Sequence, residues 1–419
     1  MKLLWLCNII PAAVQQKMDG NAGNGLWLDN MLRDLRRCGY TLHILCRGSH
    51  FSAGSLDENC SYTVFVENQP QIYEAALETL FEQEITCFQP DVIHIWGTEY
   101  GHTLAMVNAA ERLNLLDRTV IGIQGLCSVI AGHYTEGIPQ KVQRRGTLRD
   151  LLRRDTILQQ QKKFALRGEM EKSALQKARH VIGRTHWDRE CSFRINPEIQ
   201  YHFCNETLRD VFYSDGWCYN RCVRHSVFAS SCSYPIKGFH YLLEAMAEVV
   251  RRYPDASIYV TGDSFNSTGS WKGRLRQMGY QRYLSRLSKK YHLEEKIHFL
   301  GSLNPQQMKK AFLDANVFVL PSTIENSPNS LGEAMLLGVP CVAAGVGGVA
   351  DMMQHEKEGF VYSSGEVHML AHYIQQVFAM EDNAESLGEN ARVHALKTHD
   401  PKGNMDALME IYNEIGSIQ

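Results

Sequence analysis

The 419-residue sequence lacks several features that mark other protein classes. No segment reaches the roughly 18 uninterrupted apolar residues of a membrane-spanning helix. The twelve cysteines form no C-x-x-C pair, and nothing beside Cys218 and Cys222, the closest two, completes a zinc site. The 43 basic and 46 acidic residues nearly cancel, and no nucleic-acid-binding motif accompanies the basic ones. We therefore expect a soluble globular protein that binds no nucleic acid.

The scattered cysteines also predict a compartment. Cys7, Cys46 and Cys341 lie in apolar segments, where a free thiol behaves as a small hydrophobic side chain. This pattern is typical of a reducing cytoplasm rather than of a secreted disulfide scaffold. The start, MKLLWLCNIIPAA, resembles a signal peptide, but its apolar run is short and broken by Asn8. We predict a buried first strand there.

Short apolar runs alternate with amphipathic segments along most of the chain, which predicts parallel α/β sheets covered by helices on both faces. The predicted strands are LLWLC, TLHILC, VIHIW, TVIGIQ and HVIGRT, then SVFAS, SIYVTG, KIHFLG, VFVLPS, CVAAG and GFVYSS. Eleven strands exceed one ordinary open sheet, and the pattern restarts after residues 205–225. We predict two Rossmann-like, doubly wound domains with a boundary near residue 220. A ligand would bind in the crevice at the carboxyl ends of their strands.

The stretch ENSPNSLGE, at residues 325–333, places two glutamates at the turn between a strand and a helix. In the structural interpretation, Ser330 and Glu333 form a capping box and Glu325 is a solvated loop residue. In the functional interpretation, the backbone amides of Asn329, Ser330 and Leu331 bind a diphosphate at the helix start. The two carboxylates would then accept hydrogen bonds from sugar and ribose hydroxyls. A nucleotide-sugar has this chemistry.

The segment ENSPNSLGEAMLLGVPCVA resembles the E-x7-E donor signature of glycosyltransferase family 4, whose members are retaining enzymes with the GT-B fold. SYPIKG at residues 233–238, FLGSL, ANVFVLPS and GVGGVADMM follow in the family's order. PDVIHIWGTEYG and CNETLRDVFY in the first half are similar to a bacterial polysaccharide-biosynthesis branch. The resemblance implies two domains that face a central crevice. Its domains would be an acceptor-side domain at 1–220, a donor-binding domain at 221–398, and a helix at 399–419 that crosses back to the first.

The resemblance also implies roles for individual residues. Lys237 would contact the diphosphate, Glu325 the hydroxyls of the transferred sugar, and Glu333 the ribose. The diphosphate cradle would be completed by Asn329 and by the amides of Ser330 and Leu331. Gly23 and Gly25, which precede a predicted helix in GNAGNG, would let the first domain approach the donor closely.

The sequence departs from the family at two places. Ser231 and Cys232 stand where glycine and arginine are common, so stabilisation of the leaving group would depend more on the lysine and on backbone amides. Gln124 stands where a histidine often follows the fourth strand. His94 is a candidate catalytic residue, although within VIHIW it could equally be a buried, hydrogen-bonded histidine. Gln124 and His133 are candidates for contact on the acceptor side.

The implied reaction transfers a sugar from a UDP- or GDP-sugar to a hydroxyl of a glycan or lipid-linked acceptor, with retention and without a metal or other cofactor. The sequence has no Asp-x-Asp motif of the kind that metal-dependent glycosyltransferases use. Two alternatives stay open: a non-catalytic nucleotide-sugar-binding protein and a nucleotide-sugar epimerase. A nicotinamide dehydrogenase is disfavoured because no G-x-G-x-x-G directly follows a predicted strand.

Residues 141–179 are strongly basic, with twelve Lys or Arg and four Asp or Glu, a net charge of +8. Such a surface would suit peripheral contact with an anionic membrane at the inner face of the cell membrane. Charge runs are usually solvated helical faces, and this simpler interpretation stays open.

Overall fold

The computed structural model describes residues 1–20, 26–265 and 276–417 of the chain. The predicted donor-site glycines Gly23 and Gly25 lie outside the described residues. The chain divides into two compact units. The first comprises residues 1–131, 163–209 and 399 onward, and the second comprises residues 132–162 and 210–398.

The first unit contains an eight-stranded sheet with the order β3-β4-β2-β1-β5-β6-β7-β8. All neighbouring strands are parallel except β3, which runs antiparallel to β4. The strands are β1 (Lys2–Cys7), β2 (Thr41–Gly48), β3 (Ser52–Asp57), β4 (Cys60–Val66), β5 (Val92–Trp96), β6 (Thr119–Gly122), β7 (His180–Gly183) and β8 (Gln200–Phe203). The helices are α1 (Ala12–Asp19), α2 (Leu26–Arg37), α3 (Ala76–Phe88), α4 (Gly101–Arg112), α9 (His186–Ile195) and α18 (Pro401–Gly416), with parts of α5 (Cys127–His133) and α8 (Ile157–Lys177).

Alternating side chains of β1 build two cores, one on each face of this sheet. Leu3, Trp5 and Cys7 pack with buried residues of α1, α2 and α18. Leu4 and Leu6 point the other way and pack with buried residues of α3, α4 and α8. The segment MKLLWLC is thus the predicted buried strand at the centre of the sheet.

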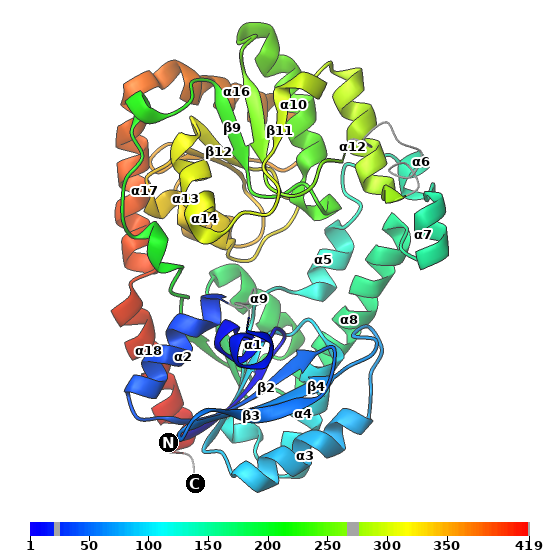
Figure 1. Ribbon diagram of the computed structural model, residues 1–419, viewed down its shortest axis with the longest axis vertical. Helices are drawn as coiled ribbons and strands as arrows, with labels where there is room; N and C mark the ends of the chain where they lie inside the picture. Colours follow the sequence, from blue (N-terminus) through cyan, green and yellow to red (C-terminus); the bar gives the residue numbers. More distant parts are fainter. Residues whose placement is uncertain (21–25, 266–275, 418–419) are drawn as a thin grey trace. The chain divides into compact units, whose positions relative to one another are not determined.

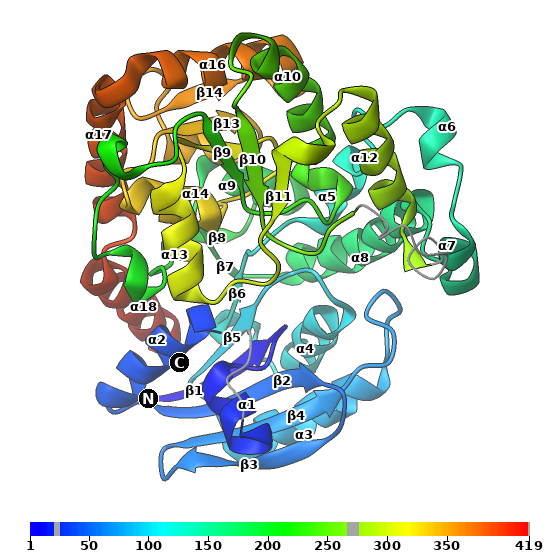
Figure 2. The same cartoon turned by 45° about the horizontal axis from the view of Figure 1, so that its top comes forward.

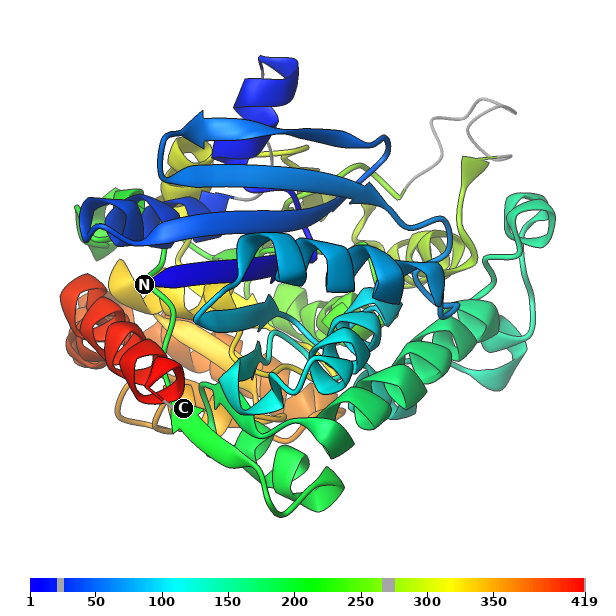
Figure 3. The same ribbon diagram turned by 90° about the horizontal axis from the view of Figure 1, so that it is seen from below.

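The last helix, α18, belongs to the first unit. Figure 3 shows it in red beside the first strand, near both chain ends. Its Tyr412 is fully buried, and the indole Nε1 of Trp5 donates a hydrogen bond of 3.2 Å to the Tyr412 hydroxyl. We expected residues 399–419 to return to the first domain, and the described part of this segment does so.

The second unit contains a six-stranded, fully parallel sheet with the order β11-β10-β9-β12-β13-β14 (Figure 2). The strands are β9 (Ser226–Ala229), β10 (Ser257–Val260), β11 (Ile297–Phe299), β12 (Val317–Leu320), β13 (Cys341–Ala344) and β14 (Phe360–Tyr362). Its helices are α6 (Gln140–Gln143), α7 (Leu148–Arg153), α10 (Phe239–Arg252), α12 (Gly279–Lys290), α13 (Pro305–Asp314), α14 (Asn329–Leu336), α15 (Val349–Met352), α16 (Val367–Met380) and α17 (Ala384–Thr398). All six predicted strands of this half are present.

The boundary between the units differs from the predicted one near residue 220. The chain passes into the second unit after Arg209, and residues 132–162 also pack with the second unit although they precede it in sequence. Figure 1 shows α6 and α7 from this insertion beside α12. Sequence periodicity could not reveal this, because the insertion lies between two strands of the first sheet.

Candidate functional site

The order of strands in the second unit defines a position for a ligand. From β9 the chain builds one side of the sheet through β10 and β11, then returns to β12 on the other side of β9. In open α/β sheets, ligands bind outside the carboxyl ends of the strands at such a switch of direction. The segment after β9 carries Lys237, and the segment after β12 carries Glu325. The two main predicted site residues therefore flank the switch point.

Lys237 and Glu325 form an ion pair across this switch point. Lys237 Nζ lies 2.6 Å from Glu325 Oε1, and the Ser322 hydroxyl donates a hydrogen bond of 2.7 Å to the same oxygen. The Glu325 side chain is 11% exposed and the Lys237 side chain 31% exposed, so both still reach the surface. Charge-assisted contacts of this kind fix the orientation of both side chains. Ser322 was missed by sequence reasoning, although a hydroxyl three residues before the glutamate was a usable signal.

Two glycines hold the Glu325 loop in place by allowing close backbone contact. Gly238 has φ +62°, and a Cβ there would lie 1.8 Å from the carbonyl oxygen of Pro321. Gly347 has φ +53°, and a Cβ there would lie 1.8 Å from the carbonyl oxygen of Glu325. The amide of Gly348 donates to that same Glu325 carbonyl at 3.2 Å. Any side chain at either glycine would displace the loop that carries the glutamate.

The start of α14 differs from both sequence interpretations in detail. The helix begins at Asn329, with Pro328 as its N-cap and no side-chain cap. The predicted capping box between Ser330 and Glu333 is therefore wrong, because Ser330 lies inside the first turn. Leu331 N–H donates to Pro328 O at 2.9 Å, so this amide is already paired. The amides of Asn329 and Ser330 precede it in the turn, where helical amides have no partner within their own helix.

Glu333 lies in the second turn of α14 and is 4% exposed. Cys232 stands where glycosyltransferase family 4 commonly has an arginine. It is also buried, with 4% of its surface exposed. Burial raises the pKa of the Cys232 thiol to about 12. Ser231 accepts a hydrogen bond from the amide of Ser233 at 3.3 Å. Neither residue supplies a positive charge to the switch point.

The first unit has its own switch point, between β1 and β5. Asn8 follows β1 and Glu99 follows β5, and Asn8 Nδ2 donates a hydrogen bond of 2.6 Å to Glu99 Oε2. Gly97, with φ +112°, lies beneath this pair, where a Cβ would come within 2.2 Å of both side chains. His102 Nε2 lies 2.7 Å from Asn8 Oδ1, and His102 Nδ1 lies 3.0 Å from Glu67 Oε2. A second polar cluster therefore occupies the equivalent position.

Glu99 is the unusual member of this cluster. Desolvation raises the pKa of its carboxyl group to about 7, and the Glu171 carboxylate adds to the rise. A carboxyl group with such a pKa can hold or release a proton near neutral pH. Sequence reasoning missed Glu99, although it lies in the quoted segment PDVIHIWGTEYG.

His94 lies in the core of the first unit. It is 0% exposed, its Nδ1 lies 2.6 Å from the Tyr412 hydroxyl, and its ring stacks on Trp96 at 3.9 Å between centroids. Burial lowers its pKa to about 3, so the ring is neutral at physiological pH. This placement favours the structural interpretation of His94, because β5 is central and buried along its length.

Gln124 and His133 lie in different units. Gln124 Nε2 donates to Glu206 Oε1 at 2.7 Å in the first unit, and Glu206 also pairs with Arg184 at 2.9 Å. His133 was expected on the acceptor side, but it belongs to the insertion in the second unit. Its carbonyl oxygen accepts a 3.2 Å hydrogen bond from the Thr323 hydroxyl, in the loop that carries Glu325. His133 therefore supports the loop that carries Glu325 through its backbone.

Within residues 1–20, 26–265 and 276–417, no group of three or more His, Cys, Asp or Glu side chains is arranged to hold a metal ion. In the same part of the chain, no helix is both long and apolar enough to span a membrane. All twelve cysteines are free.

Comparison with known proteins agrees with the geometry of the second unit. Residues 227–394 match the family model described as glycosyl transferases group 1, and this segment contains both Lys237 and Glu325. The uncharacterized glycosyltransferase MJ1607 of Methanocaldococcus jannaschii is 32% identical over 123 residues. That alignment covers 29% of this chain and 28% of the relative, so the chain matches less than a third of that protein's length.

Two solved structures resemble the whole chain. Sucrose-phosphate synthase from Thermosynechococcus elongatus gives a TM-score of 0.71 at 16% identity and covers 99% of both chains. Anabaena Alr3699/HepE, in complex with UDP-glucose, gives a TM-score of 0.67 at 19% identity and covers 99% of this chain and 100% of that one. The two parallel α/β units and this likeness show that the chain has the GT-B fold, and residues 227–394 carry the sequence features of group 1 glycosyl transferases.

Proposed function

We propose that the chain is a retaining glycosyltransferase that transfers a sugar from a nucleotide-sugar to a hydroxyl of a glycan or lipid-linked acceptor, in cell-surface polysaccharide biosynthesis. The observation that carries the proposal is the Lys237–Glu325 pair at the switch point of the second unit, beside the start of α14. The segment's match to group 1 glycosyl transferases supports it. The UDP-glucose complex of the similar HepE structure supports a nucleotide-sugar as the donor.

The second unit would bind the donor through its cation, its carboxylates and its helix start. Lys237 and the amides of Asn329 and Ser330 would meet the diphosphate, where the helix dipole also favours negative charge. Glu325 would use its second oxygen, Oε2, to accept a hydrogen bond from a sugar hydroxyl, while Lys237 and Ser322 hold Oε1. Glu333 would accept hydrogen bonds from the ribose.

The proposed reaction needs no protein nucleophile. The acceptor oxygen forms a bond to the anomeric carbon on the face from which the diphosphate leaves. The bond between that carbon and the diphosphate oxygen breaks, and a phosphate oxygen takes the acceptor proton. Catalysis then depends on positioning and on stabilising the charge of the departing diphosphate. Lys237 supplies that charge in place of a metal.

The first unit would bind the acceptor. The cluster of Asn8, Glu99 and His102 offers hydrogen-bond donors and acceptors at its own switch point. These groups suit the hydroxyls of a sugar. We place the reaction in the cytoplasm because every cysteine is a free thiol.

The experiment measures release of nucleoside diphosphate from UDP- and GDP-sugars with a panel of glycan and lipid-linked acceptors. Proton NMR of the product gives its anomeric configuration, and a parallel reaction contains EDTA. We expect turnover with one donor, retention, full activity in EDTA, and loss of turnover in Lys237→Ala. The control is Lys310→Ala, which removes a 74% exposed lysine paired with Asp314 in the same unit.

Each part of the proposal has an outcome that contradicts it. An inverted product overturns retention, and loss of turnover in EDTA overturns metal independence. A donor that binds without transfer to any acceptor makes the chain a nucleotide-sugar-binding protein. An altered nucleotide-sugar formed without an acceptor makes it an epimerase.

A further inference from the structure

The helix α7 (Leu148–Arg153) presents leucines to solvent and a carboxylate to the protein. Leu148, Leu151 and Leu152 are 58%, 62% and 77% exposed, and Leu152 is the most exposed large hydrophobic residue in the described part of the chain. Their spacing of three and four residues places them on one face of the helix. Single exposed leucines are ordinary, but three on one turn mark an interaction surface.

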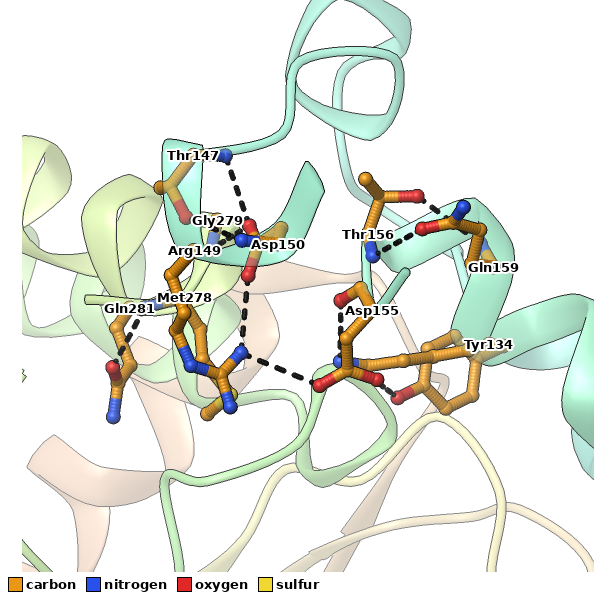
Figure 4. Close-up of polar contacts among 11 residues, drawn as sticks. Tyr134, Thr147, Arg149, Asp150, Asp155, Thr156, Gln159, Met278, Gly279 and Gln281 are labelled. Atoms are coloured by element: carbon orange, nitrogen blue, oxygen red, sulfur yellow. Dashed lines mark hydrogen bonds and ion pairs between the residues drawn. The ribbon is translucent and has the colours of Figure 1, made fainter. Parts of the chain in front are cut away.

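This orientation is fixed by polar contacts on the opposite side of α7. Asp150 is 1% exposed and accepts hydrogen bonds from the amides of Thr147 at 3.0 Å and Gly279 at 2.8 Å (Figure 4). Gly279 begins α12, so the carboxylate anchors α7 to the start of another helix. Arg149 binds Asp150 at 3.1 Å and Asp155 at 3.3 Å. The leucines therefore face outward as part of the folded structure.

The exposed charges along residues 141–154 all have one sign. Between residues 141 and 154, the exposed charged residues are all basic: Lys141, Arg144, Arg145, Arg153 and Arg154. The one acidic residue in this range, Asp150, is buried. Arg149, Leu152, Arg153 and Arg276 also line an open hollow of about 480 Å³. An exposed apolar face with a basic border and an arginine-lined hollow is complementary to anionic lipid headgroups over an apolar layer.

We propose that this α7 surface, made of Leu148, Leu151, Leu152, Arg153, Arg154 and Arg276, docks the protein on an anionic lipid bilayer. The leucines enter the boundary between headgroups and acyl chains, and the arginines bind lipid phosphates. Apart from Arg276, the surface lies within the basic run 141–179 predicted from the sequence; the structure narrows that run to its part in the insertion of the second unit and adds exposed leucines to the charge. It does not depend on the proposed function.

The test is co-sedimentation of the full chain with vesicles of equal phosphatidylcholine and phosphatidylglycerol, and with phosphatidylcholine alone. We expect binding to the mixed vesicles, weaker binding at high salt, and little binding to the neutral ones. Leu151→Ser combined with Leu152→Ser should lower the partition coefficient at least tenfold. Arg153→Gln combined with Arg154→Gln should lower it roughly fivefold per arginine.

Matched variants elsewhere in the second unit control for general loss of apolar or basic surface. Val393→Ser with Leu396→Ser removes side chains that are 48% and 40% exposed on α17. Arg251→Gln with Arg252→Gln removes two exposed arginines at the end of α10. Both control pairs should bind vesicles as the wild type does. Because all altered side chains are exposed, thermal unfolding midpoints should stay unchanged.

Three outcomes overturn the proposal. The first is equal binding of the wild type and the leucine variant to the mixed vesicles. The second is equal binding to neutral and anionic vesicles. The third is absence of vesicle binding together with a wild-type dimer that the leucine variant dissociates in analytical ultracentrifugation, which would assign the α7 surface to a second copy of the chain.

Discussion

The two units place a polar pair at the same position of the fold but with different chemistry. In the second unit, Lys237 after β9 meets Glu325 after β12 at 2.6 Å. In the first unit, Asn8 after β1 meets Glu99 after β5, also at 2.6 Å. Both contacts bridge the strands where the sheet changes direction. A shared topology thus brings together residues that are distant in sequence, and the residue types decide what each edge can bind.

The residue types at the two switch points differ in charge. The second unit offers a lysine side chain and a helix start, which suit a diphosphate. The first offers an amide, a histidine and a carboxyl group whose pKa is about 7, which suit neutral polar groups and a mobile proton. This difference supports our proposal that the donor binds the second unit and the acceptor the first.

The largest effect is expected from breaking the charged pair of the second unit. Glu325→Ala removes the hydroxyl acceptor and leaves Lys237 without its 2.6 Å partner. We expect transfer to slow about 10²- to 10³-fold, the scale seen when one group that stabilises a transition state is removed. Steady-state rates of nucleoside diphosphate release measure this. Unchanged rates would place the chemistry elsewhere, and Asp314→Asn in the exposed pair with Lys310 provides the control.

A smaller effect is expected from displacing the Glu325 loop while keeping its side chains. Gly347→Ala forces a Cβ against the Glu325 carbonyl and should lower the free energy of unfolding by about 1–3 kcal/mol, together with loss of nucleotide affinity. Gly301→Ala is a matched control, because Gly301 has φ +68° in the same unit but no atom within 4 Å of its Cβ position. Chemical denaturation and titration calorimetry separate the two. If both variants lost equal amounts of unfolding free energy and nucleotide affinity, the cause would be the backbone conformation at the glycine rather than its contact with the Glu325 loop.

The next effect concerns the core behind the first unit's switch point. Tyr412→Phe removes the hydroxyl that contacts Trp5 and His94, and should lower the free energy of unfolding by about 1–2 kcal/mol. Nucleotide affinity, which we assign to the second unit, should not change. A large loss of nucleotide affinity in this variant would contradict the separation of roles between units.

A different kind of effect is a pH dependence that only the first unit's pair predicts. The folded pKa of Glu99 is raised, so its stabilising contribution is complete below the unfolded pKa and is lost as the pH rises through about 7. The lowered pKa of His94 acts in the opposite direction, because its stability is lost as the pH falls below its unfolded value. Glu99→Gln should therefore gain stability relative to the wild type between pH 5 and pH 8, measured by denaturation at each pH. A constant difference between the two proteins would contradict the raised pKa.

The second unit was easier to predict than the first for a physical reason. Its six strands are short apolar runs between helices, and β9, β12 and β13 are buried along their whole lengths. The prediction missed β3, β4 and β8 in the first unit. The edge strands β3 and β8 contain no buried residue, so SAGSLD and QYHF show no apolar pattern. β4 is largely buried, but it pairs antiparallel with β3 and has no helix between them.

The candidate site was predictable to the extent that its residues lie in one motif. Glu325, Glu333 and the helix start come from one stretch, and Lys237 from a second. The contacts of Asn8 with Glu99 and of Thr323 with His133 join distant segments through strand order and through the insertion, which no local pattern encodes. The burial of His94 was likewise one of two open interpretations until the neighbours of β5 were known.

The most direct test of the account is thermal stabilisation by nucleoside diphosphates and nucleotide-sugars, compared between the wild type, Lys237→Ala, Glu333→Ala and Lys310→Ala. A ligand at about 100 times its dissociation constant should add roughly 2.7 kcal/mol to the free energy of unfolding. We predict stabilisation by one nucleotide family in the wild type and Lys310→Ala, and loss of that stabilisation in the other two variants. Stabilisation that persists in Lys237→Ala and Glu333→Ala, or no stabilisation by any nucleotide, would contradict a donor site at the switch point of the second unit.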